Sequence, residues 1–248
     1  MNTQLAATNL QQSAQNQKSD YVVAKFGGTS VANFEAMSRC SEIIVADNNV
    51  RVVAVSASAG VTNHLVTLCK KDLSAEERNE NIAGVIAIQE AILNELSLDA
   101  DLAHGFDETI KAFKSLASEP LKSKQQHDEL LSFGERLSSY LFTQVLRLNG
   151  LNAVRFDVRQ VLKTDSQFSK ATPDVAATAM AAKEHLIPLL AEQVIVTQGF
   201  IGSDAHGQTT TLGRGGSDYS AALLAEAINA KSVHIWTDVV GIFSTDPR

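Results

Sequence analysis

Five short runs rich in β-branched residues, separated by longer stretches of helical periodicity, most strongly constrain the fold of this chain. The runs cover 21–26, 50–57, 152–158, 192–200 and 231–239. Four of them are nearly continuous in apolar residues, which is typical of strands covered on both faces. The helical patterns cover 33–47, 61–72, 80–97, 107–118, 125–149, 174–190 and 217–230. This alternation predicts an α/β fold, a three-layer α/β/α sandwich with a mainly parallel central sheet.

Composition narrows the classes of partner. The 248 residues, 44% of them hydrophobic, suffice for one large domain or two lobes. A net charge of -7 argues against binding to nucleic acid or an anionic membrane, because both partners need a clustered positive field. No apolar run approaches the roughly 18 residues of a membrane span. Any anionic ligand must therefore be met by local cations.

The chain start and the cysteines indicate a cellular location. Residues 1–20 contain no apolar run and no arginine, so they predict a disordered polar tail and not a targeting segment. Cys40 and Cys69 lie far apart in helical patterns, which favours neither a disulfide nor a zinc site. The histidines show no metal-ligand spacing either. We expect a protein of the reducing cytoplasm with no metal ligand of its own.

The segments that follow the expected strands share small residues, hydroxyls and glycines. They read KFGGTS, SASAGVTN, TQGFIGSDAHGQTTTLGRGGSD and WTDVVGIF. Ligands of open parallel sheets bind beyond the carboxyl ends of the strands. The sequence therefore predicts a ligand site at this edge of the sheet.

A glycine-rich loop precedes the last expected helix. Gly213, Gly215 and Gly216 lie before Ser217 and Asp218, either of which can cap the helix. Outward N–H groups and the positive helix end form an anion site, and Arg214 adds a guanidinium that matches carboxylate or phosphate. The alternative is a tight turn with an ordinary N-cap. The pattern is neither a Rossmann nor a Walker loop.

Lys25 at the end of the first expected strand raises a similar choice. It precedes Gly27 and Gly28. A buried ammonium without a partner is costly. The lysine therefore either extends to solvent or points into the strand-exit cleft, where it meets a phosphate while the glycine backbone approaches closely.

Five stretches together resemble the aspartate kinases of the amino-acid kinase superfamily, in the family's order and approximate spacing. They are KFGGTSVANFEAM, SASAGVTNHLV, SFGERLSSYLF, TTTLGRGGSDYSAALLAEA and IWTDVVGIFSTDPR. The likeness is greatest to the lysine-sensitive class, although TNHLV is also similar to the bifunctional aspartokinase–homoserine dehydrogenases. It implies a carbamate kinase-like fold in 21–248, with a substrate lobe over about 21–190 and the start of a nucleotide lobe over about 191–248.

The resemblance implies transfer of the ATP γ-phosphoryl group to the side-chain carboxylate of L-aspartate. The product is 4-phospho-L-aspartate, in the first step of lysine, threonine and methionine biosynthesis by the diaminopimelate pathway. A carboxylate with a pKa of about 3.9 is already ionised, so no general base is needed. Catalysis then rests on positioning, charge neutralisation and Mg²⁺ held mainly by ATP oxygens and water.

The family pattern also implies roles for individual residues. The expected catalytic residues are Lys25 and Asp218. The expected substrate contacts are Thr62, Glu135, Arg214 and Ser217. The expected nucleotide contacts are Lys25, Phe26, Gly27, Gly28, Gly215, Gly216, Thr237, Asp238, Phe243 and Arg248. Phe243 stands where the family usually has a tyrosine, so a hydroxyl contact is lost there and an aromatic surface is kept.

Several of these residues have simpler interpretations. Thr62 alone predicts a helix N-cap, and Asp238 a turn or cap residue. Glu135 suits a substrate ammonium but could equally be a solvated helix carboxylate. Gly134 beside it costs about 1 kcal/mol relative to alanine in a helix, which indicates close approach by another group.

The family's kinase domain continues beyond the last residue here and is followed by regulatory ACT domains. We therefore expect an incomplete catalytic domain, in which aspartate contacts are better retained than ATP contacts. The family is often homodimeric, and its usual regulatory dimerisation domains are missing here. The alternatives are another amino-acid kinase, acting on glutamate, N-acetylglutamate or a nucleoside monophosphate, and an inactive truncated binding or assembly module.

Overall fold

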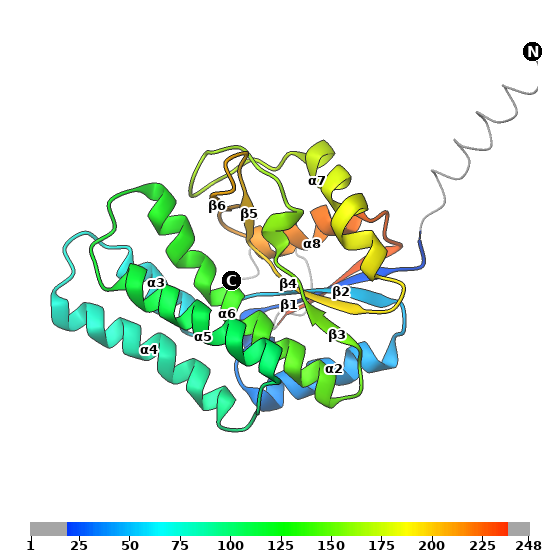
Figure 1. Ribbon diagram of the computed structural model, residues 1–248, viewed down its shortest axis with the longest axis horizontal. Coiled ribbons are helices and arrows are strands. Elements are labelled where there is room, and N and C mark those ends of the chain that lie inside the picture. Colours follow the sequence, from blue (N-terminus) through cyan, green and yellow to red (C-terminus); the bar gives the residue numbers. More distant parts are fainter. Residues whose placement is uncertain (1–18, 238–248) are drawn as a thin grey trace, which may run out of the picture.

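The protein is built on one five-stranded parallel sheet (Figure 1). The computed structural model describes residues 19–237. The strands are β1 (Val22–Phe26), β2 (Val50–Val55), β3 (Ala153–Arg155), β4 (Val194–Gln198) and β7 (Ser232–Trp236), in the order β3-β4-β2-β1-β7. All neighbouring pairs are parallel. Each predicted run contains one of these strands, so the predicted α/β fold with a mainly parallel sheet is confirmed.

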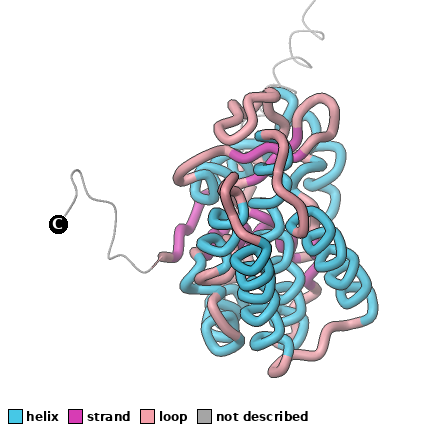
Figure 2. Tube along the Cα trace, turned by 90° about the vertical axis from the view of Figure 1, so that its left-hand side faces the viewer, coloured by secondary structure: helices cyan, strands magenta, loops and turns pink. Residues whose placement is uncertain are grey.

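Helices cover both faces of the sheet, which completes three layers (Figures 1 and 2). One layer contains α2 (Phe34–Ala46), α3 (Val61–Leu68), α4 (Ala75–Leu93), α5 (Ala100–Ala117) and α6 (Lys124–Leu148). The other contains α7 (Val175–Ala181), which continues as a π-helix (Ala182–Leu186), and α8 (Gly216–Ala227). Short 3-10 turns occur at Gly28–Val31, Val158–Gln160 and Ile187–Leu189.

Each face of the sheet has its own hydrophobic core. Alternate residues of β1 divide between them, with Val22, Ala24 and Phe26 in the core beneath α2 and α6. Val23 lies in the core beneath α8. Side chains of a strand alternate between faces, so Lys25 lies on the α8 face, at the carboxyl end of β1. This register places a charged side chain beside the start of α8.

Three local predictions were wrong or incomplete. The segment after β4 forms an antiparallel hairpin of β5 (Ile201–Ser203) and β6 (Thr209–Thr211), which the sequence pattern did not indicate because three-residue strands show no clear period. Helix α8 has Gly215 as its N-cap, so Ser217 and Asp218 do not cap it. Helix α3 has Gly60 as its N-cap, so Thr62 lies inside the first turn.

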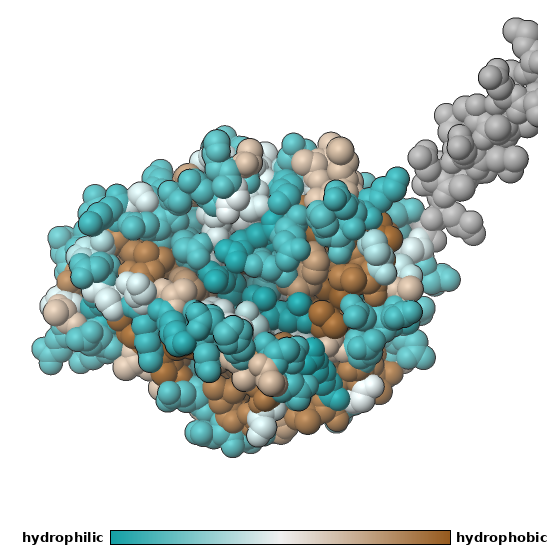
Figure 3. Space-filling model, viewed as in Figure 1, coloured by the Kyte–Doolittle hydropathy of each residue, from teal (hydrophilic) through white to brown (hydrophobic). Residues whose placement is uncertain are grey.

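The structure does not test every prediction made from the sequence. The predicted polar tail falls almost wholly outside the described residues. None of the described helices is long and apolar enough to cross a membrane. On the face shown in Figure 3, hydrophobic residues form separate patches among hydrophilic ones.

Helix α6 approaches the exit of β2 closely at Gly134. A Cβ there would lie 2.6 Å from the Cβ of Ala57 and 3.3 Å from Leu65. Gly134→Ala is therefore expected to lower the free energy of unfolding by about 1–3 kcal/mol through overpacking, despite the better helix propensity of alanine. Denaturant unfolding measures this change.

Gly84→Ala in α4 is the matched control. The nearest atoms to a Cβ at Gly84 belong to the imidazole of His64, the closest at 2.5 Å, so this half-buried ring, hydrogen-bonded to Oδ1 of Asn81 at 3.0 Å, must shift. Because the end of a side chain can shift more easily than the Cβ of Ala57, which is fixed to the backbone, Gly84→Ala should lower the free energy of unfolding by less than Gly134→Ala does. Equal unfolding midpoints for the wild type and Gly134→Ala would contradict the tight contact.

Candidate functional site

A cavity of about 520 Å³ opens at the carboxyl ends of the central strands. It lies between the exits of β1 and β2, helix α6 and the glycine loop that begins α8. Its lining comprises residues 25, 27–29, 56–60, 62, 135, 200, 213–218 and 237. This is the edge at which the strand-exit segments predicted a ligand site.

The structure brings most of the sequence-predicted site residues together around this cavity. They are Lys25, Gly27, Gly28, Thr62, Glu135, Arg214, Gly215, Gly216, Ser217, Asp218 and Thr237. The side chain of Phe26 lies instead in the core, with its ring 6.3 Å from that of Trp236 and 5.6 Å from that of Phe142. Asp238, Phe243 and Arg248 lie outside the described residues.

Lys25 does not extend to solvent. Its side chain is only 9% exposed, and its Nζ lies 2.7 Å from Oδ1 of Asp218, whose side chain is 50% exposed. Asp218 stands in the first turn of α8, directly over the end of β1. This ion pair compensates the buried ammonium and directs it into the cavity.

Glycines bring the backbone of two strand exits into direct contact. A Cβ at Gly28 would lie 2.9 Å from the carbonyl oxygen of Ala57, a distance that no side chain allows. The backbone N–H of Ala59 donates to Gly28 O at 3.1 Å, and that of Ser56 donates to Phe26 O at 3.1 Å. The cavity floor is therefore a pair of linked loops with little side-chain cover.

Glu135 is buried and is not a solvated helix carboxylate. It is 6% exposed and lines the cavity from α6. Burial raises the pKa of its carboxyl to about 8, while a hydrogen bond from the Ala57 backbone and the positive charge of Lys25 oppose this rise. The close approach predicted at Gly134 is confirmed, and the approaching group is Ala57, part of the protein itself.

Arg214 is exposed at the tip of the glycine loop. Gly213 and Gly215 on either side have φ values of 76° and 75°, which L side chains rarely adopt. Arg214 makes no hydrogen bond or ion pair within the described part of the chain. Its guanidinium is thus a cation at the cavity without a partner from residues 19–237.

Ser217 is seated by a glycine that the sequence reasoning did not single out. A Cβ at Gly199, just after β4, would lie 2.9 Å from Cβ and 3.1 Å from Oγ of Ser217. The missing side chain lets the start of α8 approach the exit of β4. The glycine at a strand end was the available signal.

The cavity lining also contains residues that were quoted only as part of motifs. These are Thr29, Ser56, Ala57, Ser58, Ala59, Gly60 and Phe200. Ser58 is 1% exposed, and its Oγ has no hydrogen-bond partner among the described residues. The position of these residues after buried strands was the signal that located them.

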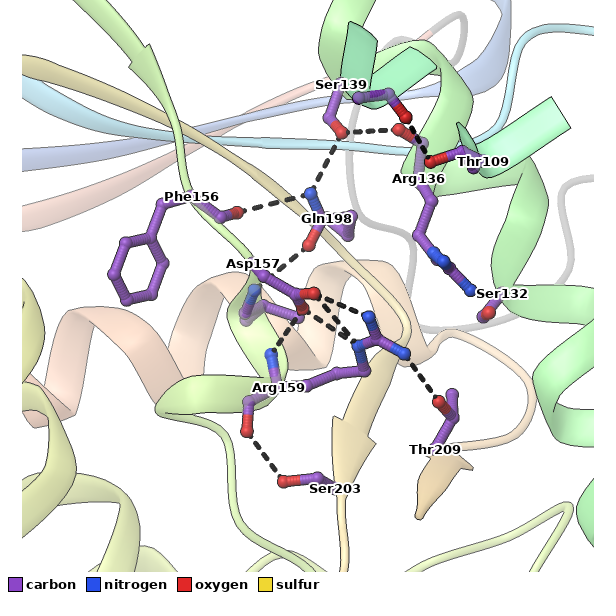
Figure 4. A network of polar contacts seen from close by, with 12 residues as sticks. Thr109, Ser132, Arg136, Ser139, Phe156, Asp157, Arg159, Gln198, Ser203 and Thr209 are labelled. Atoms are coloured by element: carbon purple, nitrogen blue, oxygen red, sulfur yellow. Dashed lines mark hydrogen bonds and ion pairs between the residues drawn. The ribbon is translucent and has the colours of Figure 1, made fainter. Parts of the chain in front are cut away.

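A buried polar network connects the elements behind the site (Figure 4). Gln198, at the end of β4, accepts from the backbone N–H of Val158 at 3.0 Å and donates to Ser139 Oγ on α6 at 2.9 Å. Arg159 pairs with Asp157 at 2.6 Å and donates to Thr209 Oγ1 at 2.8 Å. The network ties α6, β4 and the β5–β6 hairpin together, and sequence reasoning missed it because its members are far apart in the chain.

Acidic and sulfur ligands do not gather in this region. Among residues 19–237, no group of three or more histidine, cysteine, aspartate or glutamate side chains could hold a metal ion. The cavity contributes two cations, one buried carboxyl and several backbone segments. Such a set can receive a small molecule with both anionic and cationic groups.

Comparisons with curated proteins confirm the resemblance to aspartate kinases. The chain is 49% identical over 232 residues to lysine-sensitive aspartokinase 3 of Escherichia coli and 38% identical over 227 residues to the aspartokinase of Chlamydia trachomatis. These alignments cover 93% and 92% of this chain. The chain spans about half the length of the curated relatives it matches, 51% in both cases.

Solved structures show the same fold. E. coli aspartokinase III in complex with aspartate and ADP has a TM-score of 0.86 and 48% identity, over 92% of this chain and 51% of that one. Clostridium acetobutylicum aspartate kinase, at 24% identity and a TM-score of 0.72, shares the fold over 91% of this chain and 49% of its own. The amino acid kinase family model matches residues 20–248. The chain belongs to the amino acid kinase family.

Proposed function

We propose that this chain is the catalytic region of an aspartate kinase, which transfers the γ-phosphoryl group of ATP to the side-chain carboxylate of L-aspartate. One observation carries the proposal. One cavity is lined by the cation Arg214, which has no ion-pair partner within residues 19–237, by the buried cation Lys25 and by the buried carboxyl of Glu135. A relative that is 48% identical was solved in complex with aspartate and ADP, which supports this choice of ligands.

The aspartate groups match the charges of the cavity. Glu135 would accept the α-ammonium, and Arg214 with the Ser217 hydroxyl would hold the carboxylates. A guanidinium binds carboxylate through two parallel hydrogen bonds, which orients as well as attracts it. The substrate therefore enters with its charged groups paired on opposite walls.

Phosphoryl transfer to this carboxylate then depends more on neutralising negative charge than on moving a proton. A carboxylate oxygen of aspartate attacks the γ-phosphorus, the bond from this phosphorus to the bridging oxygen breaks, and ADP leaves. Lys25 would lie at the transferring phosphate, with Gly27, Gly28, Gly215 and Gly216 allowing close backbone approach. Asp218 holds the Lys25 ammonium in place before the phosphate arrives.

The same proposal covers the nucleotide contacts, the metal ion, the pathway and the cellular location. Mg²⁺ would be carried by ATP oxygens and water. Thr237, which lines the cavity, would contact nucleotide, and so would Asp238, Phe243 and Arg248, which fall outside the described residues. Residues 21–190 would form the substrate lobe and 191 onward the start of the nucleotide lobe. We place the reaction at the start of lysine, threonine and methionine biosynthesis, in the cytoplasm, where the free thiols of Cys40 and Cys69 would stay reduced.

A hydroxamate assay of acyl phosphate tests the reaction directly. With MgATP, the chain should form acyl phosphate from L-aspartate and give little signal from L-glutamate or N-acetyl-L-glutamate. N-acetylglutamate has no ammonium to pair with Glu135. Preference for either alternative substrate would contradict the proposal.

Arg214→Ala should reduce turnover with aspartate at least about a hundredfold, because a charge-assisted contact to the reacting substrate is lost. The circular dichroism spectrum should stay unchanged, since Arg214 is exposed and makes no hydrogen bond or ion pair within residues 19–237. Arg39→Ala, which removes an exposed arginine in an ion pair with Glu35 on α2, is the control. Unchanged aspartate kinetics in Arg214→Ala would remove this residue from the site.

Glu135 makes aspartate binding dependent on pH. Its pKa of about 8 in the free protein keeps it mostly protonated at pH 7. Pairing with an ammonium favours the carboxylate, so binding should release about one proton and tighten as pH rises from about 6 to 8. Calorimetry in buffers of different ionisation enthalpy measures this proton, and Glu135→Gln should abolish its release. Binding without proton release would exclude this role.

A further inference from the structure

Asp128 is a buried carboxylate that the proposed chemistry does not use. It is 0% exposed and lies on α6, about two helical turns before Glu135 and therefore on the same side of the helix. Burial raises the pKa of Asp128, and hydrogen bonds from Ser169 and Thr211 oppose the rise. A buried acid of this kind needs partners, and it finds them in two distant segments.

Those partners are the loop after β3 and the end of β6. Asp128 Oδ2 accepts the backbone N–H groups of Ser169 and Thr211, both at 2.8 Å. Its Oδ1 accepts the hydroxyl of Thr211 at 3.0 Å. Three donors separated from the acid by 41 and 83 residues thus converge on one side chain.

Both segments support the glycine loop. Thr211 ends β6, two residues before Gly213. Ser169 has a φ of 76°, and its carbonyl oxygen would lie 3.5 Å from a Cβ at Gly213. The Ala171 N–H also donates to the Thr211 carbonyl at 2.8 Å, so both segments are held to each other as well as to α6. Gly213 therefore follows a segment in which the N–H groups of Thr211 and Leu212 and the carbonyl of Thr211 are all hydrogen-bonded.

We propose that Asp128 is a positioning residue that fixes the Arg214 loop at a set distance from Glu135. Helix α6 then carries one wall of the cavity through Glu135 and anchors the opposite wall through Asp128. Substrate contacts on the two walls are useful only when their separation matches aspartate, because small misplacements weaken binding and transfer strongly. The inference rests on the proposed function for its ligand and on the hydrogen bonds alone for its geometry.

Two substitutions separate geometry from charge. Asp128→Asn keeps an oxygen for the two N–H groups, and its amide can donate to the Thr211 hydroxyl, which then accepts. Asp128→Ala removes all three contacts. Ser132→Ala is the matched control, since Ser132 is equally buried on α6 and, among the described residues, its hydroxyl bonds only to the Glu129 carbonyl of its own helix.

The experiment measures aspartate affinity and amide hydrogen exchange on the full 248-residue chain. Asp128→Ala should raise the Kd for aspartate about tenfold, since losing anchoring hydrogen bonds shifts the loop, and should speed exchange at Ser169 and Thr211. Asp128→Asn and Ser132→Ala should stay within about twofold of the wild type in both measurements. If any loss of a buried polar group on α6 were enough to weaken aspartate binding, Ser132→Ala would weaken it as well.

The other possible results also decide whether Asp128 positions the loop. Wild-type affinity in Asp128→Ala, or equal losses in Asp128→Asn and Asp128→Ala, would overturn the proposal. If Asp128→Ala does not fold, Thr211→Val removes the hydroxyl contact alone and should raise the Kd about threefold; an unchanged Kd would again overturn it. If the wild-type chain itself fails to bind aspartate, the proposed function fails. The anchoring by Asp128 is then tested by hydrogen exchange alone. Faster exchange at Ser169 and Thr211 in Asp128→Ala supports it, and unchanged exchange overturns it.

Discussion

The contact between Gly134 of α6 and Ala57 at the exit of β2 is the constraint on which the site depends. Only a residue without a side chain lets the helix come this close, since a Cβ there would lie 2.6 Å from that of Ala57. This close approach positions the neighbouring residues of α6. Ser138 donates to Ser56 O at 2.7 Å, and Glu135 lines the cavity. A packing contact thus sets the geometry of a polar site.

The charge distribution of the site follows from its burial. The chain has a net charge of -7, so its long-range field does not attract anionic substrates, and local groups must do so. Lys25 is held by Asp218, Glu135 is kept largely protonated, and Arg214 is left without a partner within the described residues. The cavity is therefore prepared for ligands that bring their own compensating charges.

Much of the fold and the site could be predicted, and the failures have physical causes. Runs rich in β-branched residues located all five strands of the parallel sheet, and four of these runs are nearly continuous in apolar residues, because burial on both faces imposes that pattern. The β5–β6 hairpin was missed because its three-residue strands, including the polar Thr209–Thr211, carry no periodicity. The predicted N-caps of α3 and α8 were wrong, because Gly60 and Gly215 cap these helices. With φ values of 89° and 75°, these glycines start the helices through their backbone conformation and not through a side-chain hydrogen bond.

The sequence by itself determined the alternation of strands and helices, the strand edge at which a site forms and the motifs that resemble aspartate kinases, because these depend on local pattern. Only the tertiary structure decided which charges are paired, which are buried and which residues support the site from behind. Lys25 and Asp218, Gly199 and Ser217, and Asp128 with Ser169 and Thr211 meet across long stretches of chain. Such pairings depend on helix and strand packing in three dimensions, and no local pattern records them.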